Sequence, residues 1–263
     1  MSNLSKCKRV LITGSSRGIG LGLVRSYLAN SNLHVIATCR SPGSATDLSS
    51  LQSQYGDRLL ILPMDVSKKS SCDGLRETLN TKGIDSIDIL IANAGIAPSR
   101  SSLLETTDED MNSAFQTNVN GSMFTAQVLH DLVCASSGKL FVMVSSIMGS
   151  VYETSSPFAA SYRVSKAALN MVSMMLAHEA PVQNSGGRVV VLHPGWVNTD
   201  MGSSAGRTPP LSVEQSVSGI SSVIESALSV QFVESTEPSD PVSRALKSNG
   251  CVYASYAGEL INW

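Results

Sequence analysis

The sequence predicts an α/β protein in which helices cover both faces of a doubly wound parallel sheet, giving three layers, α/β/α. Two observations carry this prediction. Short aliphatic and β-branched runs alternate along the chain with amphipathic stretches of helical length. The strand-like runs are nearly continuously apolar, which is typical of strands buried on both faces. Strands that alternate with helices in this way cannot be joined as hairpins, so right-handed crossovers are expected.

Six strands are expected, because six apolar runs are short and bounded by Gly, Ser or Asn. In chain order these strands span residues 9–13, 33–38, 59–62, 87–92, 139–145 and 188–193. The clearest helical segments lie between and after them, at residues 18–29, 68–79, 109–135, 160–180 and 212–228. Sheets of this kind bind ligands beyond the carboxyl ends of their strands, so candidate functional residues are sought there.

Length and composition bound the domain organisation. The chain has 263 residues, of which 42% are hydrophobic and 15% charged, against a globular average of roughly 25% charged. It is too apolar for disorder and long enough to bury a full core, so we expect one domain over residues 1–263. The Ser-, Gly- and Pro-rich stretch 202–211 is interpreted as part of a ligand-covering substrate loop at 200–212, with a plain surface loop as the alternative.

Charge and cysteine content exclude several protein classes. The formal net charge is -2 and the pI about 6.1, so no nucleic-acid footprint is expected. The five cysteines are odd in number and form no Cys-x-x-Cys pair, so neither a disulfide framework nor a metal site is expected. Residues 1–8 are short and polar where a secretory signal needs an apolar stretch, and no run of about 18 apolar residues predicts a membrane span. A cytoplasmic location is therefore expected.

A glycine-rich turn, residues 13–20, joins the first strand to the first helix and reads Thr-Gly-Ser-Ser-Arg-Gly-Ile-Gly. The free N–H groups and positive dipole at a helix N-terminus suit a pyrophosphate. Gly14 is expected to make the turn, Gly18 to allow the approach of a phosphate, and Gly20 to permit a tight contact between helix and strand. An ordinary tight turn is the alternative, but the position between strand and helix favours dinucleotide binding.

The spacing of this turn resembles the signature of the short-chain dehydrogenase/reductase family, Thr-Gly-x-x-x-Gly-x-Gly, and matches it at every fixed position. The resemblance implies a Rossmann fold. It also implies that the turn binds the cofactor through Gly14, Ser16, Arg17, Gly18, Ile19 and Gly20.

The end of the second strand bears on the choice of cofactor. Sites for NAD place an Asp or Glu there to accept hydrogen bonds from the ribose 2′-hydroxyl, whereas a basic residue accommodates the 2′-phosphate of NADP. This sequence has Arg40 and no acid, and Arg17 supplies a second positive charge. NADPH is therefore the expected cofactor, although Arg40 could instead lie in solvent at the strand end.

Tyr162 and Lys166 lie four residues apart in a helical segment and so share one face. A nearby ammonium is expected to lower the pKa of the tyrosine and poise its hydroxyl for proton transfer. This pair alone is a chance-level signal, but Ser145 and Ser146 end the fifth strand at the ligand-binding edge. In the resembled family the second serine of such a pair is catalytic, so Ser146 is preferred, and residues 147–161 are expected to line the substrate pocket.

Further segments match the family in order. The resemblance implies that Asn118 organises a proton-relay water together with the lysine. It assigns further cofactor contacts to Asp65, Val66, Asn93, Ala94, Gly95, Pro194, Val197 and Thr199, and to the catalytic Tyr162 and Lys166. In the segment around Asn93, Ala92 replaces the first asparagine of the family pattern.

Residues 195–202, 211–216 and 258–263 resemble the C-factor/sniffer-like carbonyl reductases of this family. The resemblance implies an NADPH-dependent ketoreductase or carbonyl reductase acting on a small-molecule ketone or aldehyde. It also implies a homodimer or homotetramer formed through the helices that contain Asn118 and Tyr162.

Two alternatives stay open at this point. The chain could be a dinucleotide-binding signalling protein, or an alcohol dehydrogenase running mainly in the oxidative direction. An apolar, aromatic substrate is suggested by pocket candidates that could equally be core residues: Met148, Tyr152, Phe158, Trp196 and Met201.

Overall fold

A computed structural model describes residues 8–29, 33–204, 206, 208–230, 238 and 240–263. The N-terminal stretch 1–7, which includes Cys7, and two residues of the expected loop at 200–212 lie outside the described residues. No helix among the described residues is long and apolar enough to cross a membrane.

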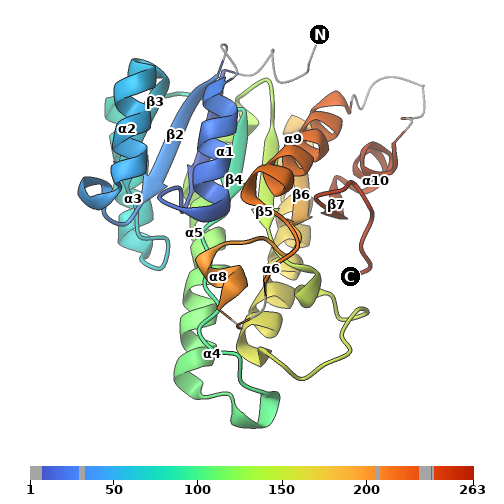
Figure 1. The fold of residues 1–263 in the computed structure, drawn as a ribbon. Helices are drawn as coiled ribbons and strands as arrows, with labels where there is room; N and C mark the ends of the chain where they lie inside the picture. Colours follow the sequence, from blue (N-terminus) through green and yellow to red (C-terminus); the bar gives the residue numbers. More distant parts are fainter. Residues whose placement is uncertain (1–7, 30–32, 205, 207, 231–237, 239) are drawn as a thin grey trace.

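Seven parallel strands form one sheet in the order β3-β2-β1-β4-β5-β6-β7. Figure 1 shows helices packed around this sheet. The order reverses between β1 and β4, which makes the edge beyond these two strands the expected place for a ligand. The strands are β1 (Arg9–Thr13), β2 (His34–Cys39), β3 (Leu59–Pro63), β4 (Ile89–Ala92), β5 (Leu140–Val144), β6 (Arg188–His193) and β7 (Cys251–Ser255).

Helices cover both faces of the sheet, and each layer encloses its own apolar cluster. Neighbouring residues of one strand point to opposite faces, so Val10 and Ile12 enter one cluster while Leu11 enters the other. One face is covered by α1 (Gly18–Ala29), α2 (Thr46–Tyr55), α9 (Val213–Ser229) and α10 (Pro241–Asn249). The other is covered by α3 (Lys69–Thr81), α5 (Gly121–Cys134), α6 (Ala160–His178) and α7 (Ala180–Ser185).

The predicted fold class is confirmed, and the six predicted strands and five helical segments lie where the periodicity placed them, with ends that differ by up to two residues. Strand β7 was not predicted, although its run Cys-Val-Tyr-Ala-Ser follows a glycine and is fully buried. The helices α2, α7 and α10 were also not predicted. In α2 only Leu48 is buried, so the segment carries little apolar periodicity.

The long helix expected at residues 109–135 is not continuous. It consists of α4 (Asp108–Ala114), a π-helical turn (Phe115–Asn120) and α5. The two expected loops also carry structure of their own. Residues Ile147–Gly149 form a 3₁₀ turn, α6 already begins at Ala160, and the short helix α8 (Asp200–Ser203) opens the second loop.

Candidate active site

The glycine-rich turn is packed too closely for side chains at two of its glycines. Gly14 has a φ of +66°, and a Cβ there would lie 2.9 Å from the Cα of Ala94. A Cβ on Gly20 would lie 2.3 Å from the carbonyl oxygen of Gly14. The turn therefore lies against both α1 and the segment that follows β4, as expected from the sequence.

The side chain of Asn93 holds this turn in place through hydrogen bonds. Its Nδ2 donates to the carbonyl oxygens of Thr13 at 2.9 Å and Gly14 at 3.2 Å. In return, the hydroxyl of Thr13 accepts hydrogen bonds from the backbone N–H groups of Asn93 and Ala94, each at 3.0 Å. The side chain of Asn93 thus shapes the phosphate-binding turn, and a direct contact with a cofactor stays a prediction.

Arg40 and Asp65 follow the carboxyl ends of β2 and β3 at the same edge of the sheet. Burial acts to raise the pKa of Asp65, but hydrogen bonds from Ser67 and the charges of Lys68 and Arg40 outweigh it and lower the pKa. The exposed guanidinium of Arg40 therefore lies near a carboxylate at the place predicted for the adenosine end of the cofactor. Val66 is buried and packs closely against Gly121, where an added Cβ would lie 2.9 Å from the Val66 side chain.

Arg17 is not a free cation, in contrast to the expectation that it stands ready for a phosphate. Its Nη1 lies 2.8 Å from a carboxylate oxygen of Asp200, and both side chains are about three-quarters exposed. This ion pair joins the glycine-rich turn to α8. Because exposed ion pairs contribute about 1 kcal/mol or less, a bound phosphate can still compete for Arg17.

The segment after β6 folds back toward the glycine-rich turn. Val197 pairs with Leu211 in a parallel bridge, and the hydroxyl of Thr199 caps α8 by accepting from the N–H of Gly202 at 3.1 Å. A Cβ on Gly18 would lie 3.3 Å from the methyl group of Thr199. The two predicted cofactor-binding segments therefore face each other. Pro194, also predicted, accepts a hydrogen bond from Ser216 through its carbonyl oxygen.

Lys166 is almost fully buried, with 3% of its surface exposed. Its Nζ donates to the carbonyl oxygen of Val144 at 2.8 Å and lies 5.6 Å from the ring centre of Tyr162. Burial lowers the pKa of Lys166 from 10.5 to about 8. The predicted pair on one helix face is therefore present, with the amine beside the tyrosine ring.

The expected lowering of the pKa of Tyr162 by Lys166 is wrong, because the pKa is raised and the charge of Lys166 is not among the causes. Burial raises the pKa of Tyr162, while a hydrogen bond with Ser146 and the charge of Arg100 only partly oppose the rise. The physical reason is that a poorly solvated site disfavours the phenolate, and the amine of Lys166 is directed at a backbone carbonyl. Tyr162 is thus held in its protonated form, which can donate a proton.

Asn118 lies in the π-helical turn and is fully buried. Its side chain accepts from the N–H of Ile96 at 2.8 Å and donates to the carbonyl oxygen of Ile96 and to the hydroxyl of Ser165, each at 2.9 Å. A Cβ on Gly95 would lie 3.2 Å from Asn118 Oδ1 and 3.5 Å from Lys166 Nζ, so these two groups converge there. The backbone carbonyl oxygen of Asn118 accepts a hydrogen bond from the hydroxyl of Ser122. The proton relay through Asn118 stays a prediction.

Tertiary contacts separate the two serines at the end of β5. The hydroxyl of Ser145 donates to Asn170 Oδ1 at 2.6 Å and so is directed into α6, whereas Ser146 hydrogen-bonds Tyr162. Tyr253 of β7 donates its hydroxyl to the carbonyl oxygen of Ser146 and lies 5.3 Å, ring centre to ring centre, from Trp263. Tyr253 and Asn170 were not predicted as site residues, since nothing in the local sequence relates them to Ser146.

The family model for short chain dehydrogenases matches residues 8–209. The chain belongs to the short-chain dehydrogenase family. The glycine-rich turn, Ser146, Tyr162 and Lys166 all lie within the matched segment.

Curated relatives and solved structures agree with this membership. A short chain dehydrogenase of Penicillium aethiopicum is 38% identical over 73% of this chain and 76% of its own length. The norsolorinic acid ketoreductase of Dothistroma septosporum is 31% identical over 85% of this chain and 86% of its own. Among solved structures, an NADPH-bound carbonyl reductase from chicken fatty liver is 28% identical, covers 98% of this chain and 100% of its own, and superposes with a TM-score of 0.82. The carbonyl reductase Sniffer of Drosophila melanogaster is also 28% identical, with a TM-score of 0.81 over 97% of this chain and 99% of its own.

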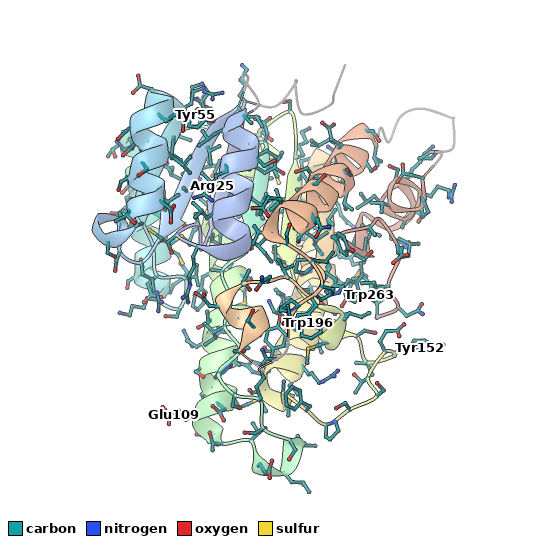
Figure 2. All side chains as sticks on the ribbon, viewed as in Figure 1. Arg25, Tyr55, Glu109, Tyr152, Trp196 and Trp263 are labelled. Atoms are coloured by element: carbon teal, nitrogen blue, oxygen red, sulfur yellow. The ribbon has the colours of Figure 1, made fainter. Side chains whose placement is uncertain are left out.

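The pocket candidates of this short-chain dehydrogenase divide into two groups. Phe158, Trp196 and Met201 are each about 40% exposed, and the indole Nε1–H of Trp196 donates to the carbonyl oxygen of Gly202 at 3.0 Å. In contrast, Tyr152 is 74% exposed at the outer edge of its loop, away from Trp196, as Figure 2 shows. The apolar surface near the site therefore comes from the first group.

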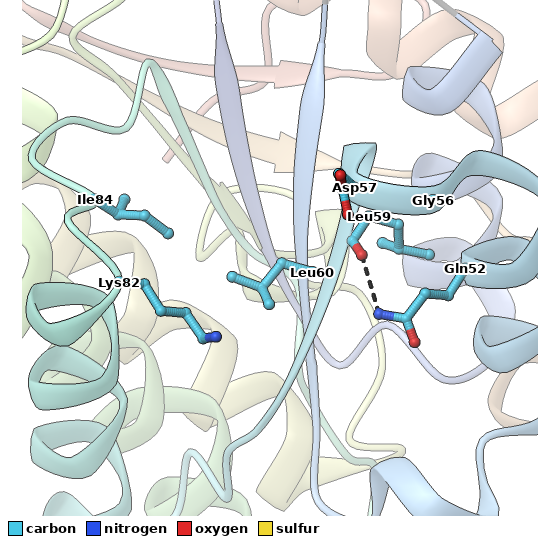
Figure 3. Close-up of a pocket in the computed structure, with 7 residues that line it drawn as sticks. All are labelled: Gln52, Gly56, Asp57, Leu59, Leu60, Lys82 and Ile84. Atoms are coloured by element: carbon cyan, nitrogen blue, oxygen red, sulfur yellow. Dashed lines mark hydrogen bonds between the residues drawn. The ribbon is translucent and has the colours of Figure 1, made fainter.

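One surface hollow of the dehydrogenase lies elsewhere. It has a volume of about 570 Å³ and opens at the amino end of β3, where the Nε2 of Gln52 donates to the carbonyl oxygen of Leu59 at 3.2 Å (Figure 3). The predicted site residues follow the carboxyl ends of the strands, at the opposite edge of the sheet. This hollow is therefore separate from the candidate active site.

Proposed function

We propose that the protein reduces a ketone or aldehyde carbonyl with NADPH. The observation that carries the proposal is the placement of Tyr162, which is hydrogen-bonded to Ser146 and lies beside the buried amine of Lys166. These groups follow β5 and begin α6, at the same sheet edge as the glycine-rich turn. The NADPH-bound carbonyl reductase from chicken fatty liver has the same fold over the full chain, which supports the proposal.

The residues present fit a dinucleotide. The close packing at Gly14 and Gly20 places the turn against the N-terminus of α1. The first N–H groups of a helix lack partners within the helix and suit a pyrophosphate. The exposed Arg40, with no acid at the end of β2, suits a 2′-phosphate. Val197 and Thr199 would hold the nicotinamide end. A bound nicotinamide supplies the hydride that reduces the carbonyl carbon.

The side chains supply the proton and hold the oxygen. Ser146 would donate a hydrogen bond to the substrate oxygen as negative charge develops on it, and Tyr162 would transfer its phenolic proton to that oxygen. Lys166, with a pKa of about 8, is mainly protonated at neutral pH and would bind the nicotinamide ribose. We place the return of a proton to Tyr162 at the junction of Lys166 and Asn118.

Reduction would use the protonated phenol of Tyr162 as the acid, and alcohol oxidation in the reverse direction would use the same tyrosine as the base. The presence of Asn118, Ser146, Tyr162 and Lys166 together disfavours a purely signalling role.

Further proposals concern organisation. We propose a single domain, because the seven strands join one sheet.

We also propose a homodimer or homotetramer formed through the helical segments that contain Asn118 and Tyr162. Val164, Met171 and Met175 are exposed along one face of α6, which supports an interface at that helix. Light scattering would give the mass of the oligomer. The free thiols of Cys39, Cys72, Cys134 and Cys251 support a cytoplasmic location, which a fluorescent fusion would test.

The test is NADPH consumption with a panel of aldehydes and ketones by the wild-type protein, Tyr162→Phe and a control, Tyr55→Phe on α2. Tyr162→Phe should lower turnover by at least about 100-fold while leaving NADPH affinity within about threefold, since general acid catalysis contributes 10²–10⁴-fold. The control should match the wild type. Appreciable turnover by Tyr162→Phe would contradict the assignment.

A further inference from the structure

Arg100 lies where three parts of the candidate site meet. It is half-buried on the segment between β4 and α4. Its Nη2 donates to the carbonyl oxygen of Met201 at 2.8 Å and to the hydroxyl of Ser204 at 2.6 Å, at the end of α8. Its Cζ lies 5.9 Å from the ring centre of Phe158, in the loop before α6. Its positive charge also acts to lower the pKa of Tyr162.

The guanidinium has binding capacity that the protein does not use. An arginine carries five N–H donors, and both hydrogen bonds found here leave from Nη2. Arg100 belongs to none of the ion pairs formed among the described residues. The carboxylate of Asp200, on the same short helix as Met201, is already paired with Arg17.

A guanidinium without a carboxylate partner is available to an anionic ligand. Guanidinium is also the side-chain group that best matches a carboxylate, through two parallel hydrogen bonds. The surroundings are apolar and aromatic, because Phe158, Trp196 and Met201 border the same region. The geometry therefore fits an aromatic carbonyl compound that carries an acid group.

We propose that Arg100 is a specificity-determining residue that binds a carboxylate of the substrate, so that the protein prefers acidic aromatic aldehydes or ketones to their neutral counterparts. This inference rests on the proposed carbonyl reduction. Charged hydrogen bonds of this kind correspond to about a 10- to 100-fold preference in kcat/KM.

A purely structural role for Arg100 makes a different prediction. If the side chain only fastened α8 to the segment after β4, its loss would slow every substrate equally. Ser204→Ala separates the two roles, because it removes one contact to α8 and keeps the positive charge. Arg163→Met is the matched charge control, since Arg163 contacts the carbonyl oxygen of Phe158 at 2.8 Å yet does not act on Tyr162.

The experiment measures kcat/KM with NADPH for the meta and para isomers of carboxybenzaldehyde and for their methyl esters. The wild-type protein should prefer the acids to the esters. Arg100→Met should lose about 10- to 100-fold on the acids and less than about threefold on the esters. Ser204→Ala and Arg163→Met should keep the wild-type acid-to-ester ratio. Arg100→Gln, which keeps an N–H donor for α8, should lose the preference as Arg100→Met does, and NADPH affinity measured alongside shows that each variant is folded.

An acid-to-ester ratio that is unchanged in Arg100→Met, or an equal loss on acids and esters, overturns the inference. If the wild-type protein reduces the esters and shows no preference for the acids, the inference fails while the proposed function stands. If it consumes NADPH with none of the four compounds but does so with other carbonyls of the panel above, the inference likewise fails while the proposed function stands. If no aldehyde or ketone of either set supports NADPH consumption, both fail.

Discussion

Lys166 offers a quantitative test of the electrostatics at this site. Burial lowers the pKa of its amine to about 8 in the folded protein, against 10.5 for the unfolded chain. The folded state therefore binds fewer protons than the unfolded state between these two values. Since stability rises with pH wherever the unfolded state binds more protons, Lys166 destabilises the fold below about pH 8, and this penalty is relieved as the pH rises toward 10.5.

The size of the effect follows from the shift. One pKa unit corresponds to 1.36 kcal/mol, so the charged amine costs the fold about 3 kcal/mol at pH 7. Between pH 7 and pH 9 this cost to the free energy of unfolding of the wild-type protein should fall by about 1 kcal/mol. Lys166→Met removes the titrating group and should show no such gain.

The assay is urea denaturation of the wild-type protein, Lys166→Met and Lys82→Met at pH 7, 8 and 9. Lys82 is exposed, so its variant controls for the loss of a lysine charge. The free energy of unfolding of the wild type relative to Lys166→Met should rise by about 1 kcal/mol over this range, and relative to Lys82→Met it should stay level. Burial raises the pKa of Tyr162 above its usual 10, so this group titrates outside the window. The reasoning would be refuted if the difference in unfolding free energy between the wild type and Lys166→Met did not change with pH. An NMR titration midpoint near 10.5 for the amine of Lys166 itself would also refute it.

Two further variants test the cofactor site. Arg40→Asp should shift the ratio of kcat/KM for NADPH over NADH toward NADH by at least about tenfold, because a carboxylate repels the 2′-phosphate and accepts from a 2′-hydroxyl; an unchanged ratio would show that Arg40 does not contact the cofactor. Gly20→Ala places a Cβ 2.3 Å from the carbonyl oxygen of Gly14, so it should weaken NADPH binding by more than about tenfold, measured by fluorescence titration. Gly43→Ala, where a Cβ meets nothing within 4 Å, should bind NADPH as the wild type does.

Local patterns in the sequence determined much of the architecture. The apolar runs and helical periodicities placed six of the seven strands and the principal helices, because burial on both faces of a sheet requires continuous apolar residues. The glycine-rich turn was predictable for a similar reason. A turn that packs as closely as Gly14 and Gly20 do excludes side chains, and this requirement is visible as a spacing of glycines. Helical spacing likewise placed Tyr162 and Lys166 on one face.

Only the tertiary structure decided how the charged and hydroxyl groups are partnered. Arg17 meets Asp200 across 183 positions of sequence, and Arg100 meets Ser204 across 104. The hydroxyl of Ser145 is directed into α6 while that of its neighbour Ser146 reaches Tyr162. The direction of the pKa shift of Tyr162 depends on burial by the surrounding chain, which no spacing of residues records. Periodicity and glycine spacing are local requirements of backbone geometry, whereas the electrostatics of a site arise from groups that come together only when distant segments pack.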